Sequence, residues 1–159
     1  MNPPYVRQEM IPKDKKSAYI TRYKLPAKSD LYAYFIIRSF RLLKEDGIAS
    51  VITSDKWLET SYGESLQKRL YGKIISVYSQ RERVFGADVN SIIFVYGNNI
   101  NKDANTDFIY LESYSSLKIL NYNEFKRSDL KCGKWFYLRA PKAFMEGISN
   151  YGQCMRKWI

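Results

Sequence analysis

Hydrophobic positions recur at helical spacing between residues 30 and 45, which predicts an amphipathic α-helix over DLYAYFIIRSFRLLKE. Ser29 or Asp30 can cap its first turn, and Gly47 lies at the position where glycine commonly ends a helix. The apolar stripe of this helix is formed by Tyr32, Phe35, Ile36, Phe40 and Leu43. A long amphipathic helix of this kind is expected to pack its stripe against a core.

A second helix is predicted over residues 61–71, where Ser61 and Glu64 form a capping-box pattern and Gly72 follows the last turn. Short apolar segments bounded by polar residues predict strands at 48–53, 73–79, 91–97 and 107–111. Helix and strand alternate along this part of the chain. The fold class predicted from this alternation is α/β.

Two regions lack a sustained hydrophobic period. Residues 6–29 contain Pro12 and Pro26, and we interpret them as a long loop, which in a compact domain is usually functional or disordered. After residue 112 the pattern weakens into Asn, Ser, Lys and scattered aromatic residues. We therefore divide the chain into residues 1–111 and 112–159, the second being the start of another, α+β or irregular, element.

Composition excludes several kinds of chemistry. The chain has no histidine, so histidine-dependent triads, histidine general bases and histidine-ligated metals are excluded. Cys132 and Cys154 make neither a disulfide framework nor a metal site by themselves. No stretch approaches the ~20 apolar residues of a membrane span, and no signal peptide is evident. We expect a reduced, cytoplasmic protein with no membrane partner and no metal.

Positive charge is concentrated at the two flanks of the chain. The net charge of +10 divides into +5 for residues 6–29, zero for residues 30–111 and +5 for residues 112–159. Such a distribution is typical of a surface that binds a polyanion, although it also fits ordinary solvated lysines. Tyr19 and Tyr23 lie among the basic residues of the first flank and could contact bases. The candidate phosphate-binding residues are Arg7, Lys13, Lys15, Lys16, Arg22 and Lys24.

The tetrapeptide Asn2-Pro3-Pro4-Tyr5 carries the most specific candidate chemistry. Each proline fixes its own φ and holds the preceding residue in extended geometry, so the backbone is stiff and non-helical. An amide oxygen and a proline carbonyl can each accept one N–H of an exocyclic amino group, while the tyrosine ring stacks on a planar ligand. The alternative is a proline-rich disordered terminus.

The order of these features resembles a known family. NPPY is followed by DLYAYFIIRSFRLLKEDGIASVITSDKWL, then GESLQKRLYGKIISV and RVFGADVNSIIFVYG. Over residues 2–100 this resembles the second half of the catalytic domain of gamma-class N6-adenine DNA methyltransferases, most closely those of type IIG restriction–modification and phage-defence systems. The resemblance implies a Rossmann-like methyltransferase fold, represented here by the C-terminal half of its sheet. It also implies double-stranded DNA as substrate and S-adenosylmethionine as cofactor.

The family mechanism can be carried over to individual residues of this sequence. The target adenine would be flipped out of the duplex, and the Asn2 side chain and the Pro3 carbonyl would accept hydrogen bonds from its amino group. Pro4 completes the motif, and Tyr5 and Phe85 would stack on opposite faces of the base. Phe35 matches a position near the cofactor's adenine, although its place on an apolar stripe suits a core role equally well.

The sequence departs from the family pattern at both ends. In the family a cofactor-binding loop and several strands precede NPPY, and a target-recognition domain follows the catalytic domain, so the resemblance implies that residues 112–159 are a linker or the start of that domain. We expect the NPPY segment to fray, the sheet to expose an apolar edge and face, and the missing half to come from a separate chain or reading frame. We therefore expect the chain alone to bind the cofactor weakly or not at all and to be inactive. The exposed edge favours self-association, and the oligomeric state is left open.

Two other functions are compatible with this sequence. Glutamine-modifying protein methyltransferases share NPPY, but the basic flanks favour DNA. A non-catalytic nucleic-acid-binding remnant would retain only the salt-sensitive, non-specific DNA binding that we expect from those flanks.

Overall fold

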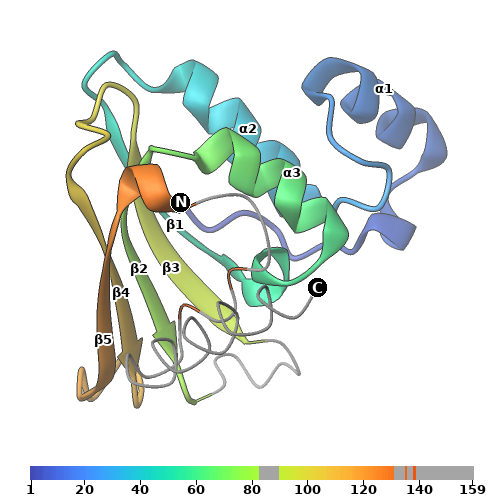
Figure 1. Cartoon of the computed structure of the whole chain (residues 1–159). Coiled ribbons are helices and arrows are strands. Elements are labelled where there is room, and N and C mark those ends of the chain that lie inside the picture. The colour runs from blue at the N-terminus through green and yellow to red at the C-terminus, as the bar shows by residue number, and fades with distance from the viewer. Residues whose placement is uncertain (83–89, 131–134, 136–137, 139–159) are drawn as a thin grey trace, which may run out of the picture.

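Five strands form one mixed sheet in the order β1-β3-β2-β4-β5 in the computed structural model, which describes residues 1–82, 90–130, 135 and 138 (Figure 1). Strands β2 and β4 are parallel, and the other neighbouring pairs are antiparallel. Their bounds are β1 Ile48–Ser54, β2 Ile74–Gln80, β3 Ser91–Gly97, β4 Asn105–Leu111 and β5 Ile119–Lys126. The first four strands confirm the sequence prediction, and β5 was not predicted.

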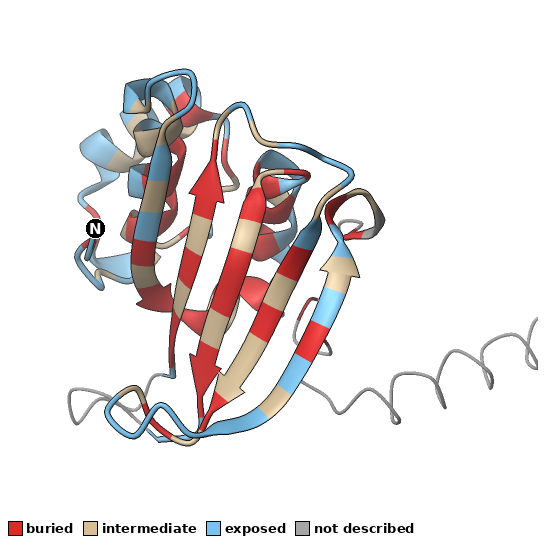
Figure 2. Cartoon of the chain, turned by 90° about the vertical axis from the view of Figure 1, so that its left-hand side faces the viewer, coloured by how far each residue is buried: buried red, intermediate tan, exposed pale blue. Residues whose placement is uncertain are grey.

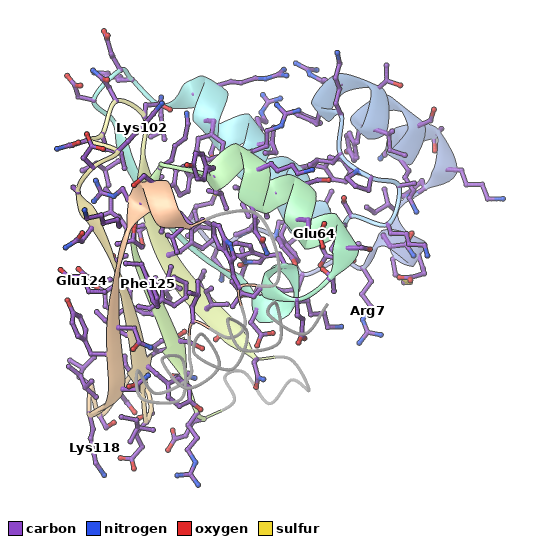
Figure 3. All side chains as sticks on the ribbon, in the orientation of Figure 1. Arg7, Glu64, Lys102, Lys118, Glu124 and Phe125 are labelled. Carbon is purple, nitrogen blue, oxygen red and sulfur yellow. The ribbon has the colours of Figure 1, made fainter. Side chains whose placement is uncertain are left out.

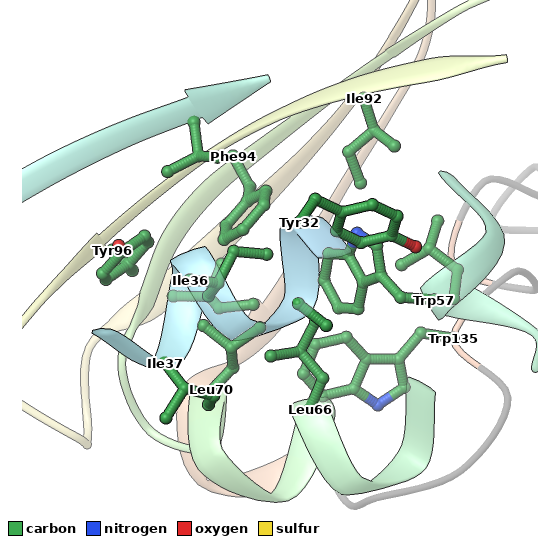
Figure 4. Packing of buried hydrophobic residues seen from close by; sticks show 14 of the residues in the cluster. Tyr32, Ile36, Ile37, Trp57, Leu66, Leu70, Ile92, Phe94, Tyr96 and Trp135 are labelled. Atoms are coloured by element: carbon green, nitrogen blue, oxygen red, sulfur yellow. The ribbon is translucent and has the colours of Figure 1, made fainter. Parts of the chain in front are cut away.

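Two helices, α2 (Leu31–Leu42) and α3 (Ser61–Leu70), cover one face of this sheet (Figure 1). Both match predicted helices. Their apolar faces meet the sheet in a core whose larger side chains include Tyr32, Ile36, Trp57, Leu66, Leu70, Phe94 and Tyr96 (Figure 4). Trp57 comes from the short 3-10 helix η2 (Asp55–Leu58), which directly follows β1. The α/β class is thus confirmed.

The helix ends differ in detail from the prediction. Asp30 occupies the N-cap of α2 but makes no capping hydrogen bond there, and the N-cap of α3 is Thr60, also without one. The predicted capping box is therefore wrong. Helix α2 ends several residues before Gly47, whereas Gly72 follows the end of α3 with a φ of 69°, a conformation that glycine adopts without strain.

The predicted loop over residues 6–29 is wrong, because it contains the short η1 (Gln8–Met10) and the helix α1 (Lys13–Tyr23). The two prolines flank α1 and do not interrupt it. Pro12 is its N-cap, and Pro26 comes after the C-cap residue Lys24, whose left-handed φ of 51° ends the helix. Only Tyr23 of this helix is buried, so its hydrophobic period is weak.

Strand β5 lies in the segment that we expected to begin a second element, yet it pairs with β4 in the same sheet. The short η3 (Arg127–Asp129) follows it. The buried Arg127 side chain donates from Nε to the Ile74 carbonyl at 2.8 Å and from Nη1 to the Asn101 carbonyl at 2.5 Å. The assignment of residues 112–159 to a target-recognition region stays a prediction, but residues 119–126 extend the catalytic-half sheet.

The second face of the sheet carries an apolar row and is not covered by any helix within the described residues (Figure 2). Strand register places one residue of every strand in this row: Ile52, Ile93, Tyr78, Ile109 and Tyr122. The first four are partly exposed and the fifth is exposed. This arrangement agrees with the apolar face that the sequence led us to expect. The described helices include none with the length and apolarity that a membrane crossing requires.

Gly63 allows α3 to pack directly on η2. A Cβ at this position would lie 2.6 Å from the carbonyl carbon of Trp57 and 2.8 Å from its Cα, with the carbonyl oxygen closer still. Gly63→Ala should therefore lower the free energy of unfolding by about 3 kcal/mol, because this clash with backbone outweighs the ~1 kcal/mol gain in helix propensity. Urea denaturation would measure the change, with Ser65→Ala on the same helix as control. A loss no greater than that of the control would contradict the packing described here.

Candidate functional site

The NPPY segment follows Met1, which pairs with the free edge of β1. The Met1 nitrogen donates to the Ser50 carbonyl at 2.6 Å, and the Ile52 amide donates to the Met1 carbonyl at 3.0 Å, which is the pattern of a parallel pairing around Val51. On the other side of the motif, the Leu31 amide donates to the Val6 carbonyl at 3.0 Å. The segment is thus held at both ends, whereas the sequence led us to expect fraying.

The four motif residues differ in exposure in a way that suits ligand contact. Pro3 is buried, whereas Asn2, Pro4 and Tyr5 are exposed. Partial burial raises the pKa of the Tyr5 hydroxyl further above neutral pH, where tyrosine is already uncharged. The buried proline anchors the motif, and its neighbours leave an amide and a neutral aromatic ring open to a ligand.

Two adjoining cavities lie next to Tyr5. The inner one, which we call the Tyr5 pocket, has a volume of about 40 Å³ and accommodates little more than water. Its lining residues are Tyr5, Val6, Arg7, Asp30, Tyr32, Ser54 and Lys56. The outer cavity, of about 340 Å³, shares three of them, Arg7, Asp30 and Lys56. Figure 3 shows Arg7 at the same end of the molecule as Glu64 of α3, far from Lys118 beyond β4.

A hydrogen-bonded chain of side chains forms one wall of these cavities. The Asp30 carboxylate accepts hydrogen bonds from the Gln8 backbone amide at 2.9 Å and from the Tyr62 hydroxyl at 3.2 Å. The Tyr32 and Tyr62 hydroxyl oxygens are 2.6 Å apart. Burial raises the pKa of both tyrosines well above the ordinary value, so both hydroxyls stay protonated at neutral pH. These hydrogen bonds therefore fix Asp30 and, through the Gln8 backbone amide, the segment that follows NPPY.

Sequence reasoning missed this wall. Asp30 was assigned only a capping role, and Lys56 and Tyr62 were not singled out. The available signal was local: Asp30 and Lys56 each stand at a boundary between a predicted element and its connection. Nothing in the sequence pattern indicates that Tyr62 reaches Asp30 from 32 residues away.

Phe35 lies outside the core, with 40% of its surface exposed. It lines a separate cavity of about 240 Å³ between α1 and α2, together with Tyr19, Tyr23, Leu31, Tyr34 and Arg38. The Tyr34 ring packs 5.4 Å from that of Tyr19 and 5.9 Å from that of Tyr23, measured between centroids. Such an aromatic cavity suits a flat ring, and the exposure of Phe35 speaks against a core role; its role at the cofactor stays a prediction.

The predicted phosphate-binding residues are distributed over two neighbouring elements. Lys13, Lys15, Lys16 and Arg22 lie on α1, Lys24 caps it, and Arg7 precedes η1. All are exposed except Lys16, which is partly buried and whose Nζ donates to the Gln8 carbonyl at 3.2 Å. Arg22 and Arg41 lie 5.8 and 5.4 Å from the Tyr23 ring centroid. Phe85, the second predicted stacking residue, lies outside the described residues.

Comparison with known proteins identifies the family. The model of the Eco57I restriction-modification methylase family matches residues 1–85, which include NPPY, both cavities beside Tyr5 and the first strand. The chain belongs to the Eco57I restriction-modification methylase family. Within the described residues, no group of three or more His, Cys, Asp and Glu side chains could hold a metal ion.

Curated relatives match parts of this chain over 67 to 104 residues. The type II methyltransferase M.BstVI of Geobacillus stearothermophilus is 43% identical over 68 residues, covering 42% of this chain and 12% of its own length. M.BanIII of Aneurinibacillus aneurinilyticus is 32% identical over 104 residues, covering 64% of this chain and 18% of its own length. The adenine-specific methyltransferase PglX of Lacticaseibacillus casei is 36% identical over 69 residues, covering 43% and 6%. The chain thus spans less than a fifth of the length of these relatives.

Solved structures support the fold. The type IIG restriction endonuclease BpuSI matches with a TM-score of 0.60 at 12% identity, over 80% of this chain and 19% of its own. A type I methyltransferase subunit from Streptococcus thermophilus matches with a TM-score of 0.52 at 18% identity, over 69% of this chain and 25% of its own. These likenesses confirm the Rossmann-like α/β fold of this methylase chain. The gamma-class assignment stays a prediction.

Proposed function

We propose that this chain forms the target-base half of a DNA adenine-N6 methyltransferase of a restriction–modification or phage-defence system. The observation that carries the proposal is the NPPY segment, which is held on both sides by the Met1 pairing with β1 and the Val6 hydrogen bond to α2, with Asn2 and Tyr5 exposed. Family membership and relatives named as adenine-specific or type II methyltransferases support the same reaction.

In this proposal the motif holds a flipped adenine. The Asn2 side-chain oxygen and the Pro3 carbonyl accept the amino group, which keeps the nitrogen lone pair directed at the methyl donor and stabilises the positive charge that develops on it. Pro4 keeps these two acceptors in a fixed geometry. Tyr5 stacks on one face of the base and Phe85 on the other.

S-adenosylmethionine, when bound, supplies the electrophilic methyl group. The aromatic cavity beside Phe35 fits the flat adenine ring of this cofactor. Double-stranded DNA is the proposed substrate, and the exposed cations of α1, with Arg7 and Lys24, would contact its phosphates.

A chimaera provides the test. Residues of this chain would replace the matching segment of M.BstVI, and transfer of a labelled methyl group would be measured with duplex DNA and with a glutamine-containing protein. We expect label on DNA adenine and none on protein. Label on protein alone would favour the glutamine methyltransferase. DNA binding without transfer, in a chimaera that folds as M.BstVI does, would favour a non-catalytic remnant.

A further inference from the structure

Lys56 stands beside Tyr5 because of the strand register. Met1 pairs in parallel with Val51. Tyr5 and Asp55, which each lie four residues further along their segment, are therefore at the same end of the sheet. Lys56 is the next residue, in η2. The carboxyl ends of strands in open α/β sheets are where such folds place ligands. Lys56 is partly buried there and lines both the Tyr5 pocket and the outer cavity.

The charge of Lys56 is not matched by a partner among the described residues. Its Nζ makes no hydrogen bond or ion pair with them. Two carboxylates also line the outer cavity and keep their negative charge, and their hydrogen bonds come from neutral donors: Asp30 accepts the Gln8 backbone amide and the Tyr62 hydroxyl, and Glu9 accepts the Gln8 side chain at 2.5 Å. Arg7 and Lys28 add two more cations to the same cavity. A partly buried, unpaired ammonium favours an anionic ligand.

The geometry points to Lys56 as the residue that binds the phosphate of the nucleotide whose base is held at Tyr5, with Arg7 assisting at the rim of the cavity. This inference rests on the proposed function, because it takes the ligand at Tyr5 to be an adenine nucleotide. The outer cavity, at about 340 Å³, is large enough for a phosphate and its sugar, whereas the Tyr5 pocket is not. Lys56 thereby orients the nucleotide and takes no part in methyl transfer.

The test compares deoxyadenosine with deoxyadenosine 5′-monophosphate in NMR titrations of the 159-residue chain. We expect the phosphate to increase affinity by about tenfold or more, since a hydrogen bond to a charged group is strong enough for that change. Lys56→Met should reduce the difference to within about twofold, and Arg7→Met should reduce it in part. Lys68→Met removes the same charge from an exposed position of α3 and should leave the difference unchanged.

Each outcome separates this inference from the proposed function. An equal phosphate effect in the Lys56→Met and unmodified chains, with equal unfolding midpoints, overturns the role of Lys56. A phosphate effect that depends on Lys56 but is as large for thymidine monophosphate, with no preference for adenine, supports the phosphate site and contradicts the adenine site. No binding of either adenine ligand contradicts both.

Discussion

Replacing Asn2 with alanine in the M.BstVI chimaera is expected to lower the rate of methyl transfer by about 10²–10³-fold, the usual effect of removing one hydrogen-bonding group that stabilises a developing charge. The alanine lacks the oxygen that accepts the adenine amino group, so one of the two proposed acceptors is lost. Asn2 is exposed and its side chain has no partner in the described structure, so the fold should not change.

Single-turnover methylation of a duplex oligonucleotide would measure this effect. The control is Thr21→Ala, which truncates an exposed polar side chain of α1 and should leave the rate unchanged. DNA affinity should stay within about twofold in both variants, because phosphate contacts dominate it. A rate loss below about tenfold would exclude Asn2 from the role of charge-stabilising acceptor.

Replacing Trp57 with alanine should lower the free energy of unfolding by about 3–5 kcal/mol, a large part of the ~5–15 kcal/mol typical of a folded domain. Trp57 is fully buried, and its ring centroid lies 5.2 Å from that of Phe94 and 5.8 Å from that of Trp135 (Figure 4). Its Nε1 donates to the Thr53 hydroxyl at 3.3 Å. The substitution removes these contacts and leaves a cavity between the sheet and α3.

Urea denaturation followed by circular dichroism would measure the loss. Trp57→Phe keeps an aromatic ring and should cost clearly less, while Leu42→Ala, at an exposed position on the last turn of α2, should cost no more than about 0.5 kcal/mol. Equal losses for Trp57→Ala and Leu42→Ala would show that Trp57 does not anchor the core.

Segments with a dense apolar face were predictable, and segments with a sparse one were not. In α2 the buried residues are Tyr32, Ala33, Tyr34, Ile36 and Ile37, and all but Tyr34 recur at helical spacing, so the helical period is clear in the sequence. In α1 only Tyr23 is buried, and tertiary contact with α2 and the left-handed cap at Lys24 determine the helix. Strand β5 was missed for a similar reason, since it is an edge strand with mostly exposed residues.

The candidate site divides in the same way. NPPY was identifiable because its chemistry is contained in four consecutive residues. Phe35 was ambiguous because helical spacing cannot distinguish a core aromatic from one that lines a cavity on the helix flank. The Asp30–Tyr62 contact and the position of Lys56 beside Tyr5 depend on how α3 and β1 are placed in space, which no local pattern encodes.

The Asp30 carboxylate makes the NPPY region and the start of α3 a single cooperative unit. It is bonded both to Gln8, three residues after Tyr5, and to Tyr62 in the first turn of α3. Opening of either segment breaks this link and exposes the other, so their local unfolding free energies are coupled. Because such coupling is reciprocal, a nucleotide that orders Tyr5 is also expected to slow hydrogen exchange at the first turn of α3, where Ser61 and Tyr62 line the outer cavity.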